Sequence, residues 1–204
     1  MRLLALILFV LSVSACSTHH LVKPIDMQTG KFSSYEQISE ADIKIYKPID
    51  HFDKVPFILL RAYAYHEPEK HYKFMVDSLK LLGVENVMSD ADLTKLIIKN
   101  NLSAQVNSLK NPIALNNLSK IVGPFLILEF VTIPKYGSVW EQALIVSNPF
   151  SVESVLRMER TKTYMMHYDN EFNYPVLDLL NSWVKESKEL SKTKPKDQRN
   201  ELGA

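Results

Sequence analysis

The feature that most constrains the fold is the segment Phe125 to Ile133, FLILEFVTI, which is apolar except at Glu129 and Thr132. A short apolar run that follows a Gly-Pro pair is typical of a central, buried strand. Such a strand needs other elements to cover it. The chain is therefore predicted to fold around a sheet that packs against helices.

Apolar spacing along the rest of the chain predicts strands and helices in alternation. Strands show period-2 alternation or β-forming residues, and helices show apolar stripes with cap residues at their ends. The expected strands are Ile43–Tyr46, Val55–Tyr65, Val84–Met88, Phe125–Ile133, Val139–Ser147 and Val152–Thr163, and the expected helices are Glu69–Leu82, Ser89–Asn100, Asn111–Val122 and Pro175–Leu190.

This order predicts an α/β (α+β) fold with a single small mixed sheet. Apart from the short edge strand at Ile43–Tyr46, the elements follow as β-α-β-α-α-β-β-β-α. Strand–helix alternation followed by a strand meander gives such a sheet, and the helices are expected mainly on one of its faces. The turn at Asn148–Ser151 is expected to join the last two strands as a hairpin.

Strand parity predicts which side chains share the face opposite the helices. In Val55–Tyr65 the small apolar residues alternate with arginine and tyrosine, which are expected to be partly solvated. Two interpretations stay open for that face: a solvated ladder of cross-strand charge pairs, or a docking surface rich in hot-spot residue types. The predicted partner-binding residues are Arg61, Tyr63, Tyr65, Glu129, Glu141, Arg157 and Glu159.

The N-terminus reads as an export signal. Arg2 supplies a positive charge, Leu3 to Leu11 is an apolar run too short to span a bilayer, and small residues follow. The sequence Val13-Ser14-Ala15-Cys16 resembles the lipobox of bacterial lipoproteins, which implies cleavage before Cys16 and lipidation of its thiol. In that family an aspartate after the cysteine retains the protein in the inner membrane. Ser17 at this position implies the outer membrane, on its periplasmic side.

The expected organisation is a signal peptide at 1–15, a lipidated flexible tether at 16–42, the α/β domain at 43–190 and a disordered charged tail at 191–204. A net charge of +1 gives no electrostatic case for a nucleic-acid partner. Cys16 is the only cysteine, so its lipidation would exclude disulfides and cysteine chemistry. No cofactor is predicted, because the five glycines form no phosphate-binding cluster.

The sequence gives little sign of catalysis or metal binding. It contains no G-x-S-x-G, H-E-x-x-H or Walker pattern. His66 and His71 are spaced poorly for two metal ligands and are interpreted as surface residues. Asp90 and Asp92 are interpreted as charges at a helix start. Glu129 is the exception, because a carboxylate in an apolar strand needs a partner or a shifted pKa.

The element order also resembles a small α/β domain of several envelope proteins: the amino-terminal domain of TolB and the domains of CsgG, PelC and LpoB. The resemblance covers roughly Phe57 to Leu190. It rests on the element order, on the helix-to-strand junction Leu79-Lys80-Leu81-Leu82-Gly83-Val84 and on the closing helix that begins Tyr174-Pro175-Val176. It implies a non-enzymatic binding or assembly module and transfers no site residue.

The predicted function is therefore that of a non-enzymatic, lipid-anchored periplasmic module that binds an envelope protein or a second copy of itself. One alternative is a ring-forming component of a secretion or polysaccharide export system. Less favoured alternatives are a periplasmic hydrolase that uses Glu129 or Glu141 with a histidine, and a carrier for a lipid, which would need an apolar cavity.

Overall fold

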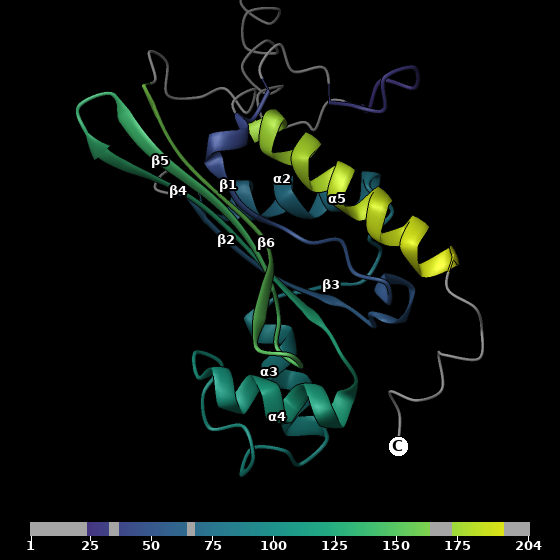
Figure 1. The fold of residues 1–204 in the computed structure, drawn as a ribbon. Coiled ribbons are helices and arrows are strands. Elements are labelled where there is room, and N and C mark those ends of the chain that lie inside the picture. The colour runs from purple at the N-terminus through teal and green to yellow at the C-terminus, as the bar shows by residue number, and fades with distance from the viewer. Residues whose placement is uncertain (1–23, 33–36, 65–67, 164–172, 194–204) are drawn as a thin grey trace, which may run out of the picture.

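The computed structural model describes residues 24–32, 37–64, 68–163 and 173–193. These residues form one six-stranded mixed sheet with helices (Figure 1), which confirms the predicted fold class. The strands follow the spatial order β1-β6-β5-β4-β2-β3. Their bounds are β1 Ile43–Tyr46, β2 Ile58–Ala64, β3 Val87–Met88, β4 Leu126–Tyr136, β5 Val139–Asn148 and β6 Glu153–Thr163.

Strand pairing changes direction within the sheet. β2 runs parallel to both β3 and β4, whereas β4, β5 and β6 form the predicted antiparallel meander and β1 pairs antiparallel with β6. The predicted hairpin turn after Asn148 is confirmed. Asn116 of α4 (Pro112–Val122) holds that turn through its side-chain amide, which donates 2.8 Å hydrogen bonds to the carbonyls of Pro149 and Phe150.

Helices α2 (Pro68–Leu81) and α5 (Tyr174–Thr193) cover one face of the sheet. Their apolar stripes meet the even-numbered residues of β2 and β4 in the larger of two cores. Gly83 ends α2 with φ +72, a conformation that glycine adopts without steric cost. The fully buried side chains of this core include Leu60, Phe74, Met75, Leu79, Leu128, Phe130, Leu144, Leu156, Val176, Leu180 and Trp183.

Helices α3 (Asp90–Lys99) and α4 lie against the other face, so the expectation of helices mainly on one face is wrong. The reason is that β2 and β4 begin with residues that are apolar on both sides. Leu59 and Ile127 point away from α2 and form a second core, which α3 and α4 cover. Figure 1 shows these two helices gathered at one end of the sheet.

Both helices of the second layer begin at predicted caps. Ser89 and Asp92 form a reciprocal capping box at the start of α3, and the Asn111 side chain accepts a hydrogen bond from the N–H of Ile113 at the start of α4. The interpretation of Asp90 and Asp92 as charges at a helix start is confirmed. The caps fix where each helix leaves the sheet.

The domain extends beyond both expected boundaries, 43 and 190. Phe32 is fully buried, stacks on Tyr174 with ring centroids 5.6 Å apart, and donates its backbone N–H to the Asp178 carboxylate at 2.7 Å. At the other end, the buried Ser191 hydroxyl accepts the N–H of Phe52 at 3.0 Å. Residues expected to be tether therefore pack on α5, which offers Phe32 a ring to stack on and a carboxylate acceptor. The first residues expected to be tail continue α5 itself and pack on the segment around Phe52.

Candidate functional site

The strand register places the predicted binding residues on one face of the sheet, as parity predicted. Arg61, Glu129, Ile145 and Arg157 form one row across four adjacent strands. The next row holds Tyr63, Val131, Ala143 and Glu159, and the third holds Ile133, Glu141 and Thr161. Tyr65 and Cys16 lie outside the described residues, so neither is placed.

Arg61 is more covered than the sequence suggested. Its side chain is only 10% exposed. Its guanidinium donates to the Asp90 carboxylate at 3.0 and 3.1 Å, to the carbonyl of Leu109 at 2.7 Å and to Glu129 at 3.5 Å. These bonds tie β2 to the start of α3 and to the loop before α4. Arg61 therefore organises the second helical layer, and its charge is unavailable as a docking group.

Glu129 has the partner that its apolar strand required. It lies beside Arg61 on the neighbouring strand, and its side chain is 36% exposed. A half-exposed carboxylate next to an arginine is a cross-strand ion pair. The hypothesis of a buried catalytic acid at this position has no support in that arrangement.

Away from Arg61 and Glu129, this face of the sheet is open to solvent. Tyr63 is 51% exposed and Ile133 is 41% exposed, while Val131, Ala143 and Ile145 are partly exposed. Arg157 and Glu159 pair with each other along β6 and are both substantially exposed. We call this surface the open face; its residues are Tyr63, Val131, Ile133, Glu141, Ala143, Ile145, Arg157 and Glu159.

Strand parity predicted the charged and tyrosine members of the open face, but its apolar members were not predicted. Val131, Ile133, Ala143 and Ile145 share the parity of Glu129 and Glu141, so the signal was present in the alternation. It was obscured because β4 is apolar on both sides for most of its length.

The described histidines lie away from Glu129 and Glu141. His71 is buried, not on the surface as expected, because it stacks on Phe130, whose side chain points to the α2 face. Burial lowers the pKa of His71 to about 4, and its Nε2 atom has no hydrogen-bond partner among the described residues. His51 contacts its neighbour Asp50 at 3.0 Å. Within the described ranges no acid–histidine pair forms on the open face, and no cluster of potential metal ligands is present.

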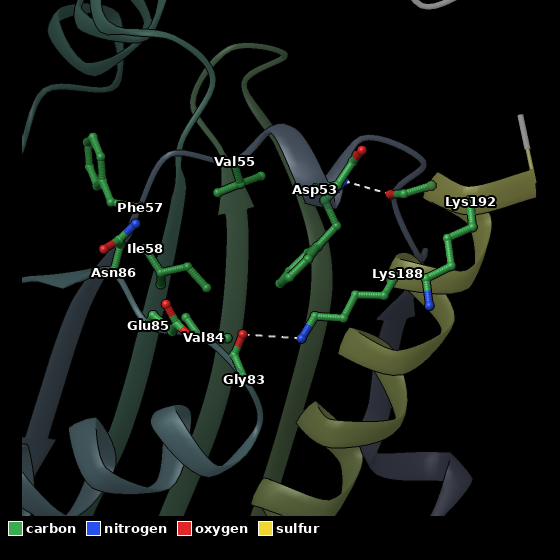
Figure 2. Close-up of a pocket in the computed structure, with 12 residues that line it drawn as sticks. Asp53, Val55, Phe57, Ile58, Gly83, Val84, Glu85, Asn86, Lys188 and Lys192 are labelled. Carbon is green, nitrogen blue, oxygen red and sulfur yellow. Dashed lines mark hydrogen bonds between the residues drawn. The ribbon is translucent and has the colours of Figure 1, made fainter. Parts of the chain in front are cut away.

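A second candidate region is a surface hollow of about 380 Å³ between η3 (Phe52–Lys54), the end of α2 and the end of α5. Figure 2 shows Lys188 reaching from α5 toward the carbonyl of Gly83. Its ammonium donates to the carbonyls of Leu82 and Gly83 at 3.1 and 3.2 Å and lies 5.8 Å from the centre of the Phe52 ring. Lys188 therefore joins α5 to the C-terminal end of α2, a favourable place for a cation.

No family model matches the chain, and no curated protein matches it. Among solved structures, the LpoB C-terminal domain from Salmonella enterica is 12% identical, with 62% of this chain and 88% of that chain covered and a TM-score of 0.37. A PelC dodecamer from Paraburkholderia phytofirmans is 10% identical, with 75% and 96% covered and a TM-score of 0.36.

A lipoprotein from Neisseria meningitidis is also similar, at 16% identity, with 68% of this chain and 96% of that chain covered and a TM-score of 0.33. At these identities and TM-scores the similarity assigns neither a function nor site residues to this chain. None of the helices in the described ranges has the length and apolar character needed to cross a bilayer.

Proposed function

We propose that this protein is a non-enzymatic lipoprotein of the cell envelope, anchored by lipid at Cys16, that binds another envelope protein through the open face. The observation that carries the proposal is the half-uncovered sheet. One end of this face is closed by α3 and α4, whereas Tyr63 and Ile133 in the rows beyond Arg61 are exposed and no helix of the described ranges lies over them.

The composition of the open face supports a protein partner. Antiparallel strands that face water usually alternate cleanly between apolar and polar residues, but here the outward side carries valine, isoleucine, alanine and tyrosine in adjacent rows. Contiguous apolar surface with a charged rim is typical of protein interaction sites. Tyr63 lies among these apolar residues, and Glu141, Arg157 and Glu159 supply charges near them.

The N-terminal sequence supports the location. The apolar run before Val13-Ser14-Ala15-Cys16 and the serine at position 17 fit an outer-membrane lipoprotein whose domain faces the periplasm. Within the described ranges the open face holds no acid–histidine pair, which supports a binding role over the hydrolase alternative. Two surface hollows of the described residues are lined in part by charged side chains, which is a poor match to a lipid carrier.

The binding role is tested with Ile133→Ser and Tyr63→Ala in intact cells by chemical crosslinking and identification of the crosslinked protein. Both changes should reduce the yield of one defined envelope partner at least tenfold. The matched control is Ile113→Ser, which alters an equally apolar and 71% exposed side chain on α4, outside the open face. An unchanged partner yield in both open-face variants would contradict the proposal, and crosslinks only to a second copy would favour the ring-forming alternative.

The anchor is tested with Cys16→Ala and a labelled fatty-acid analogue. The label should be present in the wild-type protein and absent in the variant, and the wild type should sediment with the outer membrane. Label that persists in Cys16→Ala would show that the lipid is attached elsewhere or that the signal is read differently.

A further inference from the structure

The β4–β5 hairpin projects past the end of β2, away from α3 and α4 (Figure 1). β2 pairs with β4 as far as Thr132, whereas β4 and β5 stay paired as far as Tyr136. Gly137, with φ +53, lies in the turn between the two strands. We call residues 134–138 the tip.

The tip places an aromatic ring and a cation side by side in solvent. Tyr136 is 66% exposed, and its neighbour Lys135 is also exposed. Tyrosine joins an apolar ring to a polar hydroxyl, and lysine joins an apolar stem to a charged head. Both side chains therefore suit the boundary between the headgroups and the acyl chains of a lipid bilayer.

The docked segment at 24–32 lies at the same end of the domain as the tip (Figure 1). Phe32 stacks on Tyr174, the first residue of α5. The preceding residue, Asn173, accepts a hydrogen bond of 3.0 Å from the side chain of Gln142 on β5. Gln142 is three residues from the tip end of β5, which is about 10 Å along a strand.

The position of the proposed anchor decides which end of the domain faces the bilayer. Exposed apolar side chains occur at both ends, because Met27 of the docked segment is 96% exposed and Ile113 of α4 is 71% exposed. Residues 17–23 separate Cys16 from the docked segment. A lipid on Cys16 therefore holds the tip end toward the membrane, and α4 lies at the far end of the domain.

We propose that the tip and Met27 contact the phospholipid surface in which Cys16 is anchored. The side chains of Tyr136 and Met27 enter the headgroup boundary, and the ammonium of Lys135 lies beside lipid phosphates. α3 and α4 then point away from the membrane. This inference rests on the proposed function, because it needs the lipid on Cys16, and it adds the bilayer as a second surface that the domain binds.

The test uses the full-length lipidated chain in vesicles of phosphatidylethanolamine and phosphatidylglycerol, with or without a spin-labelled lipid that quenches fluorescence. Ser138→Cys in the tip and Asn117→Cys on α4 each supply one exposed site for a fluorescent probe, because the thiol of Cys16 is blocked by its lipid. The spin-labelled lipid should lower the fluorescence at position 138 at least about twofold and leave that at position 117 unchanged, because quenching requires contact with lipid.

A combined change at both contacting side chains tests which residues make the contact. Tyr136→Ser together with Met27→Ser should remove at least about half of the quenching at position 138, because the apolar contact with the headgroup boundary is lost. The matched control is Ile113→Ser on α4, which should leave the quenching unchanged. Both variants should still float with the vesicles, because the lipid on Cys16 is retained.

The inference is wrong if the vesicle-bound chain shows no quenching at position 138, if positions 138 and 117 are quenched equally, or if the combined variant is quenched as the wild type is. In these three cases the anchor and the open face stand. A wild-type chain that does not float with the vesicles would contradict the anchor itself. If quenching is absent and Tyr136→Ser lowers the yield of the crosslinked partner in cells, the tip belongs to the protein interface and not to a lipid surface.

Discussion

Arg61 and Arg157 occupy the same row on the same face of the sheet, yet their surroundings are opposite. Arg61 is 10% exposed and contacts two carboxylates and a backbone carbonyl from three separate segments. Arg157 is 44% exposed and contacts Glu159 two residues along its own strand. The difference arises from the cover, because α3 and the loop before α4 close over one end of the row only.

This comparison shows that strand parity and burial are separate properties. Parity is a local consequence of the backbone and assigns both arginines to one face. Burial depends on which distant elements pack over that face. Two residues that parity assigns to the same face can therefore have different roles. One, at the covered end of a row, stabilises the fold, and the other, at the open end, is available for binding.

The largest loss of stability is expected at Phe32, which lies outside the predicted domain at 43–190 and packs on α5. Phe32→Ala should lower the free energy of unfolding by about 3 to 5 kcal/mol, because a fully buried ring is removed from the α5 interface. Urea unfolding measures this. Met27→Ala is the control, since that side chain is 96% exposed and should change stability by less than about 0.5 kcal/mol. If both variants were equally stable, the packing of Phe32 would not stabilise the domain, and the prediction of a flexible tether at 16–42 would stand.

The face of the sheet that α2 and α5 cover should lose stability in acid because of His71. Burial lowers the folded-state pKa to about 4 from an ordinary value of 6.5, so the stability that neutral His71 allows is complete above pH 6.5. This contribution to the free energy of unfolding falls by roughly 3 kcal/mol as the pH drops toward 4, because the unfolded chain binds the proton at a higher pH than the folded protein does. Unfolding of wild type and His71→Leu between pH 7 and 4.5 measures the difference. Parallel pH profiles would show that His71 is not the group responsible.

Arg61→Ala tests the covered end of the row directly. It should cost about 2 to 3 kcal/mol, because Asp90 and the Leu109 carbonyl lose a donor at a site that is partly shielded from water. Urea unfolding measures the loss. Arg61→Lys should recover only part of it, because an ammonium cannot bridge Asp90, Glu129 and Leu109 together. A loss of less than about 1 kcal/mol in the free energy of unfolding would show that Arg61 behaves as a solvated residue, as parity alone suggested.

The smallest effect is expected at the open end. Arg157→Ala should change the free energy of unfolding by less than about 0.5 kcal/mol, because its ion pair with Glu159 is exposed. The same variant tested in the crosslinking assay shows whether the charge contributes to partner capture. A large loss of stability would mean that an additional element covers this end of the row, and the open face would be closed in the folded protein.

Local patterns in the sequence predicted much of the fold. The capping signals at Ser89 and Asn111, the apolar run at 125–133 and the hairpin turn after Asn148 are all short-range features, and each element formed where its pattern predicted. The shared face of Arg61, Glu129 and Arg157 also followed, because alternation fixes the direction of side chains once a strand is assigned.

The remaining features depend on contacts between distant segments. Nothing near His71 in the sequence indicates that Phe130 packs on it, and nothing near Phe32 indicates that Tyr174 stacks on it. The second helical layer was missed because Leu59 and Ile127 can serve either a buried or an open face, and only the position of α3 and α4 decides between them. The apolar part of the candidate site was hidden for the same reason.

The docking of residues 24–32 on the domain has a geometric consequence for the proposed lipoprotein. The turn in this segment is closed by hydrogen bonds between Asp26 and Gly30 or Lys31, and the Gly30 carbonyl accepts the Asn181 side chain of α5. If Cys16 carries the lipid as proposed, the residues between it and the first docked residue are 17–23 instead of 17–42. Fully extended, they would span about 30 Å instead of about 90 Å. The proposed anchor would then hold the docked segment within about 30 Å of the bilayer, and a partner would be bound near the membrane surface.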